Sequence, residues 1–383
     1  MDMAELLIQT LERGASDLHI AVGTPPAIRV HGDIERLASC PALTGDDAHD
    51  LIYQVMNDYQ RARFEETGDL DFSLDFGSQG RFRVNSFKGR SGCGAVFRVI
   101  PSRIKSIQEL GMPEVISRLA DYERGLVLVT GPTGSGKSTT LAALIDQINS
   151  NGKGHILTIE DPIEFVHQHK QCVVNQREVG SHTASFATAL RAALREDPDV
   201  ILVGEMRDLE TIALACTAAE TGHLVFGTLH TSSAAQTVDR IIDVFPTHQQ
   251  AQIRTQLSAS LRGVVAQTLV RTCDGTGRAA VVEVLVSTPA VRNLIREGKT
   301  FQLPSIIQTG TKEGMITIEA SLYELLKKGR ITREEALSKA PDREQFIKLL
   351  EEHGAGTIGD PDRVGTPSLE PRGNFGFVGL SRA

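Results

Sequence analysis

The sequence of 383 residues contains no tryptophan, and aromatic residues make up only 5% of it. Proteins that bind single-stranded nucleic acid stack bases on aromatic side chains and track the backbone with basic residues. A chain with few aromatics and a formal net charge of −8 at pH 7 is not typical of that class. We therefore expect no nucleic-acid partner, and a nucleic-acid translocase is a disfavoured alternative.

Long hydrophobic runs are also missing from the sequence. No apolar stretch approaches the ~20 residues that a membrane-spanning helix needs. The first residues, Met-Asp-Met-Ala-Glu, have neither the basic nor the apolar region of a signal peptide. These two absences lead us to expect a cytoplasmic protein.

Cysteines are few, odd in number and scattered, without a C-x-x-C pair. Such a pattern predicts neither a disulfide framework nor a zinc site. We expect reduced and mostly buried thiols. The five positions are Cys40, Cys93, Cys172, Cys216 and Cys273.

A phosphate-binding loop pattern, G-x-x-x-x-G-K-[ST], lies at residues 131–138 as G-P-T-G-S-G-K-S. The apolar run at 125–130 has the length of a strand, and residues 138–149 have the apolar spacing of a helix. Glycines let successive N–H groups curl around a phosphate, and the helix N-terminus adds its partial positive charge. This context predicts a nucleotide-binding loop rather than a chance glycine-rich turn.

Two residues of the loop have further expected roles. The Lys137 ammonium should reach the β- and γ-phosphates of ATP, and the Ser138 hydroxyl should coordinate Mg²⁺. ATP and Mg²⁺ are therefore the expected cofactors. The residues expected to contact the nucleotide are Gly131, Pro132, Thr133, Gly134, Ser135, Gly136, Lys137, Ser138 and Thr139.

Two acidic motifs follow predicted strands of the same sheet. Glu164 ends the run T-I-E-D-P-I-E after the strand at 155–160, and Glu205 follows the four apolar residues 200–203. We expect Glu205 to hold Mg²⁺ through its water shell and Glu164 to orient or deprotonate the attacking water. A lone acid at a strand end is ordinarily a helix cap or a surface ion pair, but the shared sheet favours function.

Two histidines, His223 and His230, flank the next predicted strand in the run T-G-H-L-V-F-G-T-L-H-T. An isolated histidine more often makes a structural hydrogen bond. Their place on the strand after the second acidic motif suggests sensing of the γ-phosphate, with His230 the better candidate. Two histidines without a nearby cysteine make a metal site unfavourable.

The pattern of elements predicts several units. A small α+β unit with a mostly antiparallel sheet comes first, and apolar strands alternating with helices then indicate a parallel α/β sheet. A helical region and a glycine-rich tail, expected to be disordered, complete the chain. The expected bounds are 1–100 for the first unit, 101–120 for a linker, 121–287 for the α/β domain, 288–353 for the helical region and 354–383 for the tail.

Two long helices are part of this expectation. Thr44 and Asp47 resemble a capping box that opens a helix towards Phe64. Thr247 is expected to cap a second helix, whose apolar spacing extends through Leu269.

Four stretches together resemble the secretion ATPase superfamily: G-P-T-G-S-G-K-S-T-T, I-E-D-P-I-E, D-P-D-V-I-L-V-G-E-M-R-D-L-E-T and A-E-T-G-H-L-V-F-G-T-L-H-T. Within it, the chain is similar to the retraction ATPases of type IV pili, the PilT type. The match runs from Ser16 to about residue 345. It leaves the glycine-rich tail outside.

The resemblance implies a homohexameric ATPase with a PAS-like N-terminal domain, a RecA-like ATPase domain and a C-terminal helical region. It also implies that N-terminal arginines close on the γ-phosphate, and Arg83 and Arg98, with Arg81 nearby, are the matching candidates. Charges on a solvated strand face are the alternative for each. The implied partners are a PilC-type platform protein of the inner membrane and, as a second ATPase, PilU.

The resemblance also singles out A-V-R-N-L-I-R-E at residues 290–297 as needed for retraction. Val291, Leu294 and Ile295 form one apolar stripe that a helix should bury. Arg292 and Arg296 lie off that stripe, four residues apart on one side of the helix.

Three alternatives to a retraction motor stay open. The first is an accessory ATPase of the PilU type, and the second is an assembly or type II secretion ATPase. Those assembly and secretion enzymes typically carry a longer N-terminal region and a tetra-cysteine module, which this sequence lacks. The third is a scaffold that binds ATP without turnover, and the intact Lys137, Glu164 and Glu205 argue against it.

Overall fold

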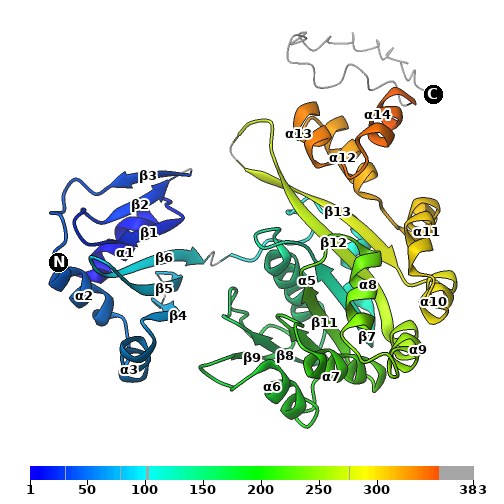
Figure 1. The fold of residues 1–383 in the computed structure, drawn as a ribbon, viewed down its shortest axis with the longest axis horizontal. Coiled ribbons are helices and arrows are strands. Elements are labelled where there is room, and N and C mark those ends of the chain that lie inside the picture. The colour runs from blue at the N-terminus through cyan, green and yellow to red at the C-terminus, as the bar shows by residue number, and fades with distance from the viewer. Residues whose placement is uncertain (31, 78, 101–102, 276, 353–383) are drawn as a thin grey trace, which may run out of the picture.

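The computed structural model describes residues 1–30, 32–77, 79–100, 103–275 and 277–352. Two β-sheets organise these residues, as Figure 1 shows. The smaller sheet, blue to cyan, belongs to the N-terminal unit, and the larger one carries most of the helices. In the described part of the chain, no helix has both the length and the apolar character needed to span a membrane.

The N-terminal sheet has six strands in the order β3-β2-β1-β6-β5-β4, and every pairing is antiparallel. Its apolar face packs against helices α1 and α2, with fully buried Phe82, Val84 and Phe97 among the contacts. The predicted antiparallel α+β unit is confirmed. Its elements are α1 (Met3–Glu12), β1 (Asp17–Ile20), β2 (Ala27–Val30), β3 (Asp33–Arg36), α2 (Gly45–Gln54), α3 (Asp58–Thr67), β4 (Asp69–Asp75), β5 (Arg81–Gly89) and β6 (Gly92–Ile100).

The single helix predicted from Thr44 to Phe64 is wrong, because the structure has two helices there. Thr44 and Asp47 do form the expected capping box at the start of α2. A second capping box, from Asn57 and Gln60, opens α3 and holds Asn57 in an extended conformation. Because an N-cap residue lies outside its helix, that second box ends any continuous helix.

The larger sheet has seven strands in the order β13-β12-β7-β11-β10-β8-β9. All neighbours are parallel except the β12–β13 pair, so the predicted parallel-rich α/β sheet is confirmed. Its strands are β7 (Gly125–Thr130), β8 (His155–Glu160), β9 (Val173–Glu178), β10 (Val200–Val203), β11 (Leu224–Leu229), β12 (Leu261–Arg271) and β13 (Arg278–Val286).

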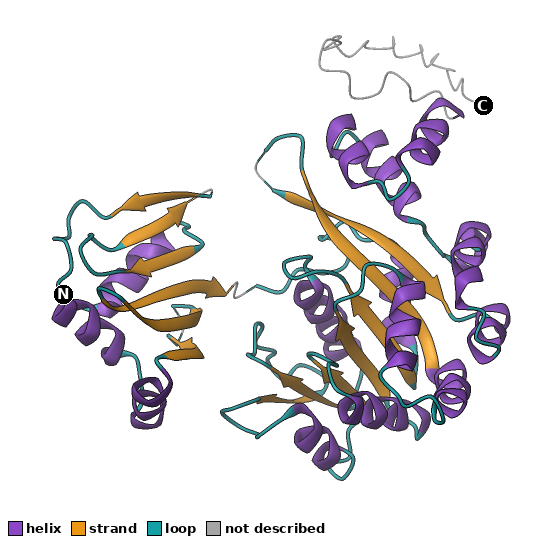
Figure 2. Cartoon of the chain, in the orientation of Figure 1, coloured by secondary structure: helices purple, strands orange, loops and turns teal. Residues whose placement is uncertain are grey.

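Helices cover both faces of this sheet, as the purple ribbons around the orange strands show in Figure 2. One face packs against α6 to α10, and the other against α4 and α5. Central strands β7, β10 and β11 are consequently buried along their whole length. The helices are α4 (Glu114–Arg118), α5 (Lys137–Asn151), α6 (Phe186–Ala193), α7 (Leu209–Glu220), α8 (Ala234–Asp243), α9 (Gln250–Ser260) and α10 (Pro289–Arg296).

The long helix predicted from Thr247 through Leu269 is also wrong. Helix α9 ends at Ser260, and the next eleven residues form strand β12. This strand is buried on both faces and is therefore mostly apolar. A mostly apolar run contains apolar residues at helical spacing by chance, which is why the strand resembled a helix. Gly263 lets β12 pass close to its neighbours, since a Cβ there would lie 2.8 Å from the Leu119 side chain and 3.1 Å from the Leu285 carbonyl oxygen.

The C-terminal region is helical, as predicted. Thr288 caps α10 through the Val291 N–H, with Pro289 in its first turn. The last three helices pack as a cluster on the far ends of β12 and β13. The remaining elements are α11 (Leu303–Thr309), α12 (Ile318–Lys327), α13 (Arg333–Lys339) and α14 (Arg343–Glu352), with short 3₁₀ turns at Leu119–Asp121, Thr300–Gln302 and Thr311–Glu313. The tail expected at 354–383 lies outside the described residues.

All five cysteines are free thiols. Cys172 and Cys216 are buried, Cys40 and Cys93 are half-buried, and Cys273 is exposed. The expectation of reduced thiols agrees with this arrangement. The expectation that most of them are buried is wrong.

Candidate functional site

Four predicted motifs meet at one edge of the larger sheet. Strands β7, β11, β10 and β8 are neighbours and run parallel, so their carboxyl ends lie side by side. The phosphate loop follows β7, Glu164 lies beyond β8, Glu205 follows β10, and His230 follows β11. Open α/β sheets bind their ligands in the crevice outside these strand ends. Motifs that are far apart in the sequence therefore lie together in one site.

The loop itself has the backbone of an anion cradle. Gly134 and Gly136 have φ of 78° and 87°, in the left-handed region that favours glycine. A Cβ at Gly131 would collide with the Gln267 carbonyl oxygen, and one at Gly136 would lie 2.8 Å from the Gln267 side-chain nitrogen. The Ser135 hydroxyl is buried and has no hydrogen-bond partner among the described residues. A phosphate oxygen is the kind of group that this loop fits.

Gln267 on β12 braces the loop from behind, a role that the sequence analysis missed. Its amide nitrogen donates to the Ser135 carbonyl oxygen at 2.6 Å, and its amide oxygen accepts from the Thr140 hydroxyl at 2.8 Å. Gln267 and Thr140 are both buried. The available signal in the sequence was a pair of polar residues, Gln267 and Thr268, inside the apolar run at 264–270.

Lys137 lies at the first position of α5, and its ammonium folds back over the loop. It donates to the carbonyl oxygens of Gly131 at 2.8 Å and Pro132 at 3.1 Å. Partial burial lowers the pKa of Lys137, while the carboxylates of Glu205 and Glu164 oppose that shift. The lysine therefore lies within the field of both acids, as the proposed chemistry requires.

Glu205 is held by two basic side chains. His230 approaches it with Nε2 at 2.8 Å from Oε1, and the Arg207 guanidinium donates to the same oxygen. The Glu205 side chain is only 19% exposed, against 43% for His230. Thr228 on β11 fixes the turn, because its hydroxyl donates to the Gly204 carbonyl oxygen at 2.5 Å. Sequence reasoning placed Glu205 and His230 but missed Arg207 and Thr228.

The first acidic motif contains two carboxyl groups besides Glu164, those of Glu160 and Asp161. Glu160, the last residue of β8, accepts hydrogen bonds from the Thr158 hydroxyl at 2.6 Å and the Gln176 amide at 3.1 Å. Burial raises the pKa of Glu160 to about 7. The nearby charge of Glu164 acts in the same direction. Burial therefore favours the protonated form of Glu160, in a loop that also contains Asp161 and Glu164.

Oxygen ligands for Mg²⁺ are available beside the loop. Ser138 is half-buried in the first turn of α5, after β7, and Glu205 follows β10, two strands away in the same sheet. Hydroxyl and carboxylate oxygens suit a hard cation that keeps several waters and binds through substrate phosphates. Among the described residues, no three His, Cys, Asp or Glu side chains form a metal cluster by themselves. The residues present fit Mg²⁺ held together with a nucleotide.

The two candidate arginines lie in different surroundings. Arg83 on β5 has its Nε 4.0 Å from the Asp71 carboxylate, and its charge opposes the raised pKa that burial gives Asp161. Arg98 on β6 is paired with buried Asp17, with Nε 2.9 Å from Oδ1. Arg83 thus faces the acidic loop of its own chain, whereas Arg98 is held within the N-terminal sheet.

His223 does not join the site. It precedes β11, at the opposite end of the strand from His230. Its Nδ1 lies 3.0 Å from the Ala218 carbonyl oxygen at the end of α7. A structural hydrogen bond therefore accounts for this histidine.

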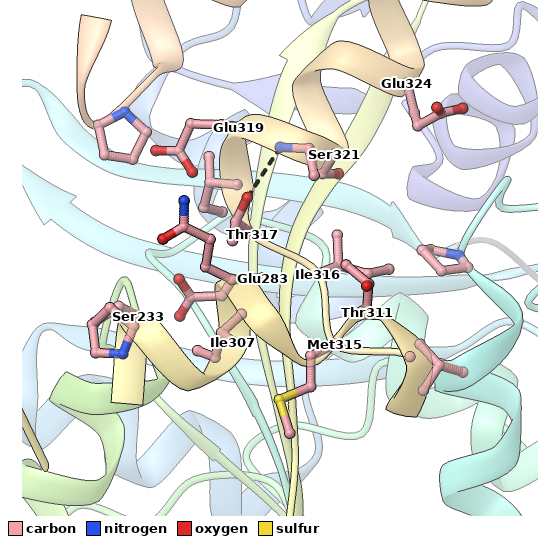
Figure 3. Close-up of a pocket in the computed structure, with 18 of the residues that line it drawn as sticks. Ser233, Glu283, Ile307, Thr311, Met315, Ile316, Thr317, Glu319, Ser321 and Glu324 are labelled. Carbon is pink, nitrogen blue, oxygen red and sulfur yellow. Dashed lines mark hydrogen bonds between the residues drawn. The ribbon is translucent and has the colours of Figure 1, made fainter. Parts of the chain in front are cut away.

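A groove of about 1120 Å³ lies elsewhere, between β13, the segment before α4 and the C-terminal helices. Figure 3 shows Glu283 and Ser233 on one side of it and Glu319, Ser321 and Glu324 of α12 on the other. The described residues that line it include neither the phosphate loop nor Glu164 or Glu205. Its chemistry is separate from the nucleotide site.

Comparison with known proteins places the chain in a family. The family described as "Type II/IV secretion system protein" matches residues 2–338. A Pseudomonas aeruginosa protein named type IV pilus retractation ATPase PilT is 58% identical over 346 residues, covering 90% of this chain and all of that protein. The Pseudomonas aeruginosa type IV pilus ATPase PilU is 44% identical over 358 residues, covering 93% and 94%.

A solved structure has the same arrangement. The crystal structure of the pilus retraction motor PilT with bound ADP matches with a TM-score of 0.84 and 49% identity, covering 90% of this chain and 98% of that one. The predicted resemblance, the α/β fold class and the expected ATP hydrolysis are confirmed, and PilT is more similar than PilU. The chain belongs to the family of type II/IV secretion system proteins and is one of its ATPases.

Proposed function

We propose that this chain is an ATP-hydrolysing motor that powers the retraction of type IV pili. One observation carries the proposal: the phosphate loop, Glu164 and Glu205 converge at one edge of the sheet in a chain that resembles PilT over almost its full length. The convergence of these residues supports ATP hydrolysis, and the similarity to PilT supports the retraction of pili as its purpose. The higher identity to PilT than to PilU favours the retraction motor over the accessory ATPase.

Each site residue has a distinct part in hydrolysis. The loop N–H groups and Lys137 bind the phosphates, and Glu164 orients and deprotonates the attacking water. His230 holds the Glu205 carboxylate in place from β11. Ser138, and Glu205 through water, would hold Mg²⁺, which would neutralise phosphate charge when bound.

Assembly completes the site in this proposal. The chain forms a homohexamer, in which Arg83 and Arg98 contribute guanidinium groups to the γ-phosphate, since these groups stabilise charge on the transferring phosphoryl. The ring acts on a PilC-type platform protein at the cytoplasmic face of the inner membrane, with PilU as a second ATPase.

Two loop variants in the full-length chain test the proposal. Lys137→Ala removes the point charge over the phosphates, and Glu164→Gln keeps shape but cannot accept a proton. We expect Lys137→Ala to lose nucleotide binding or turnover. Glu164→Gln should bind ATP but turn it over at least about a hundredfold more slowly.

The assay is ATP turnover of the purified protein beside twitching motility in a strain that lacks its own copy of the gene. The unaltered chain should restore motility, and neither variant should. Near-normal turnover of Glu164→Gln would remove it from the base role and make Glu205 the candidate. If the unaltered chain hydrolyses ATP but does not restore motility, the proposal of a retraction motor is wrong.

A further inference from the structure

Glu178 joins the two sheets at the edge of the nucleotide site. It is the last residue of β9, it is buried, and its Oε2 accepts from the Ile163 N–H at 3.0 Å. Ile163 immediately precedes Glu164. The carboxylate therefore ties down the backbone of the loop that presents Glu164, through a bond to the adjacent peptide.

The same carboxylate binds the N-terminal sheet. The Ser73 hydroxyl, on β4, lies 2.9 Å from Oε2 and 3.2 Å from Oε1 of Glu178. A serine hydroxyl has one proton to donate, and here it points to an acceptor in the other sheet. Figure 1 shows the loops beyond β8 and β9 on the side of the larger sheet that faces β4. Ser73 is thus a direct polar link between the two units.

Ser73 is itself held in place by its own sheet. Arg81 on β5 donates from Nη2 to the Ser73 hydroxyl oxygen at 3.1 Å. Ser73 is also the cross-strand partner of Arg83, the candidate arginine that faces Asp161. Any displacement of the β4–β5 pair therefore moves Arg83 and the Ser73 hydroxyl together.

A stabilising contact between domains is the simpler explanation of this bond. Ser181 offers a comparison, because its hydroxyl donates to Oε1 of the same carboxylate at 3.0 Å from the turn that follows β9. A hydrogen bond from either serine to Glu178 would stabilise the folded protein. Only Ser73 makes the position of Glu178 depend on the N-terminal sheet.

We infer that Ser73 and Glu178 are a positioning pair that sets the loop carrying Glu164 according to the placement of the N-terminal sheet. When that sheet is docked, Ser73 holds Glu178, Glu178 holds the Ile163 N–H, and Glu164 is presented to the nucleotide. Movement of the sheet releases the first bond and loosens the loop. The inference rests on the base role proposed for Glu164.

The test compares Ser73→Ala with Ser73→Thr and Ser181→Ala in the full-length protein. Loss of one hydrogen bond to a carboxylate should lower kcat about tenfold in Ser73→Ala. The affinity for a fluorescent ADP analogue should stay within about twofold, because the phosphate loop is untouched. Ser73→Thr keeps the hydroxyl and should restore most of the turnover. Ser181→Ala should lower kcat by less than about threefold, since the link between sheets is intact.

A double-mutant cycle with Glu178→Gln separates the pair from a general loss of stability. If the two residues act as one unit, Ser73→Ala should add little to the loss already caused by Glu178→Gln. Independent, multiplying losses would overturn the inference. So would equal kcat for Ser73→Ala and Ser181→Ala, or a fall in kcat explained by a matching fall in Tm.

Failure of this inference is distinguishable from failure of the Glu164 assignment. An inactive Glu164→Gln beside a fully active Ser73→Ala leaves the base in place and removes the positioning pair. An active Glu164→Gln removes the base whatever Ser73→Ala does.

Discussion

Replacement of Gln267 by methionine is the sharpest test of how β12 supports the phosphate loop. Methionine keeps the length and approximate volume of the side chain but neither donates nor accepts a normal hydrogen bond. The Ser135 carbonyl oxygen and the Thr140 hydroxyl would both lose the partners seen at 2.6 and 2.8 Å. Both groups lie in a buried setting, so each lost partner counts in full.

The expected magnitude follows from those two bonds. A buried polar group left without a partner costs about 1 to 3 kcal/mol. Thr140 can partly compensate, because a threonine hydroxyl in a helix can bond the carbonyl oxygen four residues earlier. We therefore expect Gln267→Met to lower the free energy of unfolding by about 2 to 4 kcal/mol. The affinity for ADP should fall about tenfold, since the Ser135 peptide is part of the phosphate loop.

The assay is urea denaturation together with titration of a fluorescent ADP analogue. Thr140→Val is the matched control, because it removes the hydroxyl end of the contact and leaves the bond to Ser135. It should cost about 1 kcal/mol and leave ADP affinity unchanged. A free energy of unfolding within about 0.5 kcal/mol of the unaltered protein for Gln267→Met, with unchanged affinity, would refute the brace.

Three other changes test separate features of the molecule. Glu160→Gln should reduce the pH dependence of stability. A pKa raised from 4.5 to about 7 makes the folded protein bind the proton more tightly, so this group should take up to about 3 kcal/mol from the free energy of unfolding as pH rises from 4.5 to 7, and that loss should be missing when the variant is denatured across the same window. Arg83→Ala should lower kcat about a hundredfold or more with little change in ADP affinity, because ADP lacks the transferring phosphoryl, and full turnover would assign this arginine to a solvated face. Arg292→Ala combined with Arg296→Ala should leave a folded oligomer with substantial ATP turnover but no twitching motility, and loss of assembly or a large fall in Tm would instead make the helix structural.

The prediction for Arg292 and Arg296 depends on the apolar stripe of α10, which the structure confirms. Val291 and Ile295 of α10 are fully buried, and Leu294 packs partly against the same core. Arg292 is half-buried and Arg296 is exposed, so neither is needed to fill the core. The apolar residues hold the helix, and the arginines are available to other surfaces.

Local chemistry decided which parts of the fold could be predicted. The phosphate loop, the two acids and His230 each follow an apolar run of strand length, and parallel strands bring such ends together. The strand β12 could not be recognised, because burial on both faces removes the alternation that distinguishes strand from helix. Strand β9 was missed because only its first two residues, Val173 and Val174, are apolar, so it lacks the apolar–polar alternation of a half-buried strand.

The supporting side chains of the site were harder to predict than the motifs. Gln267 and Thr228 contact the loops from strands that are distant in sequence, at positions set only by the register of the sheet. Glu178 has the same dependence, because its partners come from two different sheets. No spacing along the chain encodes such contacts. The domain bounds expected from the sequence, and the catalytic roles of the site residues, stay predictions.

The antiparallel pairing of β12 with β13 gives the larger sheet a stiff ribbon along one border. The two strands pair continuously over residues 263–271 and 278–286, with Gln267 opposite Val282. Val282, the cross-strand partner of Gln267, lies four residues before the end of β13 at Val286, or about 13 Å at the rise of an extended strand. A ladder of hydrogen bonds fixes the two strands in register, so the position of Gln267 sets the position of the end of β13. Helix α10 begins three residues later, at Pro289. The ribbon thus connects the strand residue that braces the phosphate loop with the helix that carries Arg292 and Arg296.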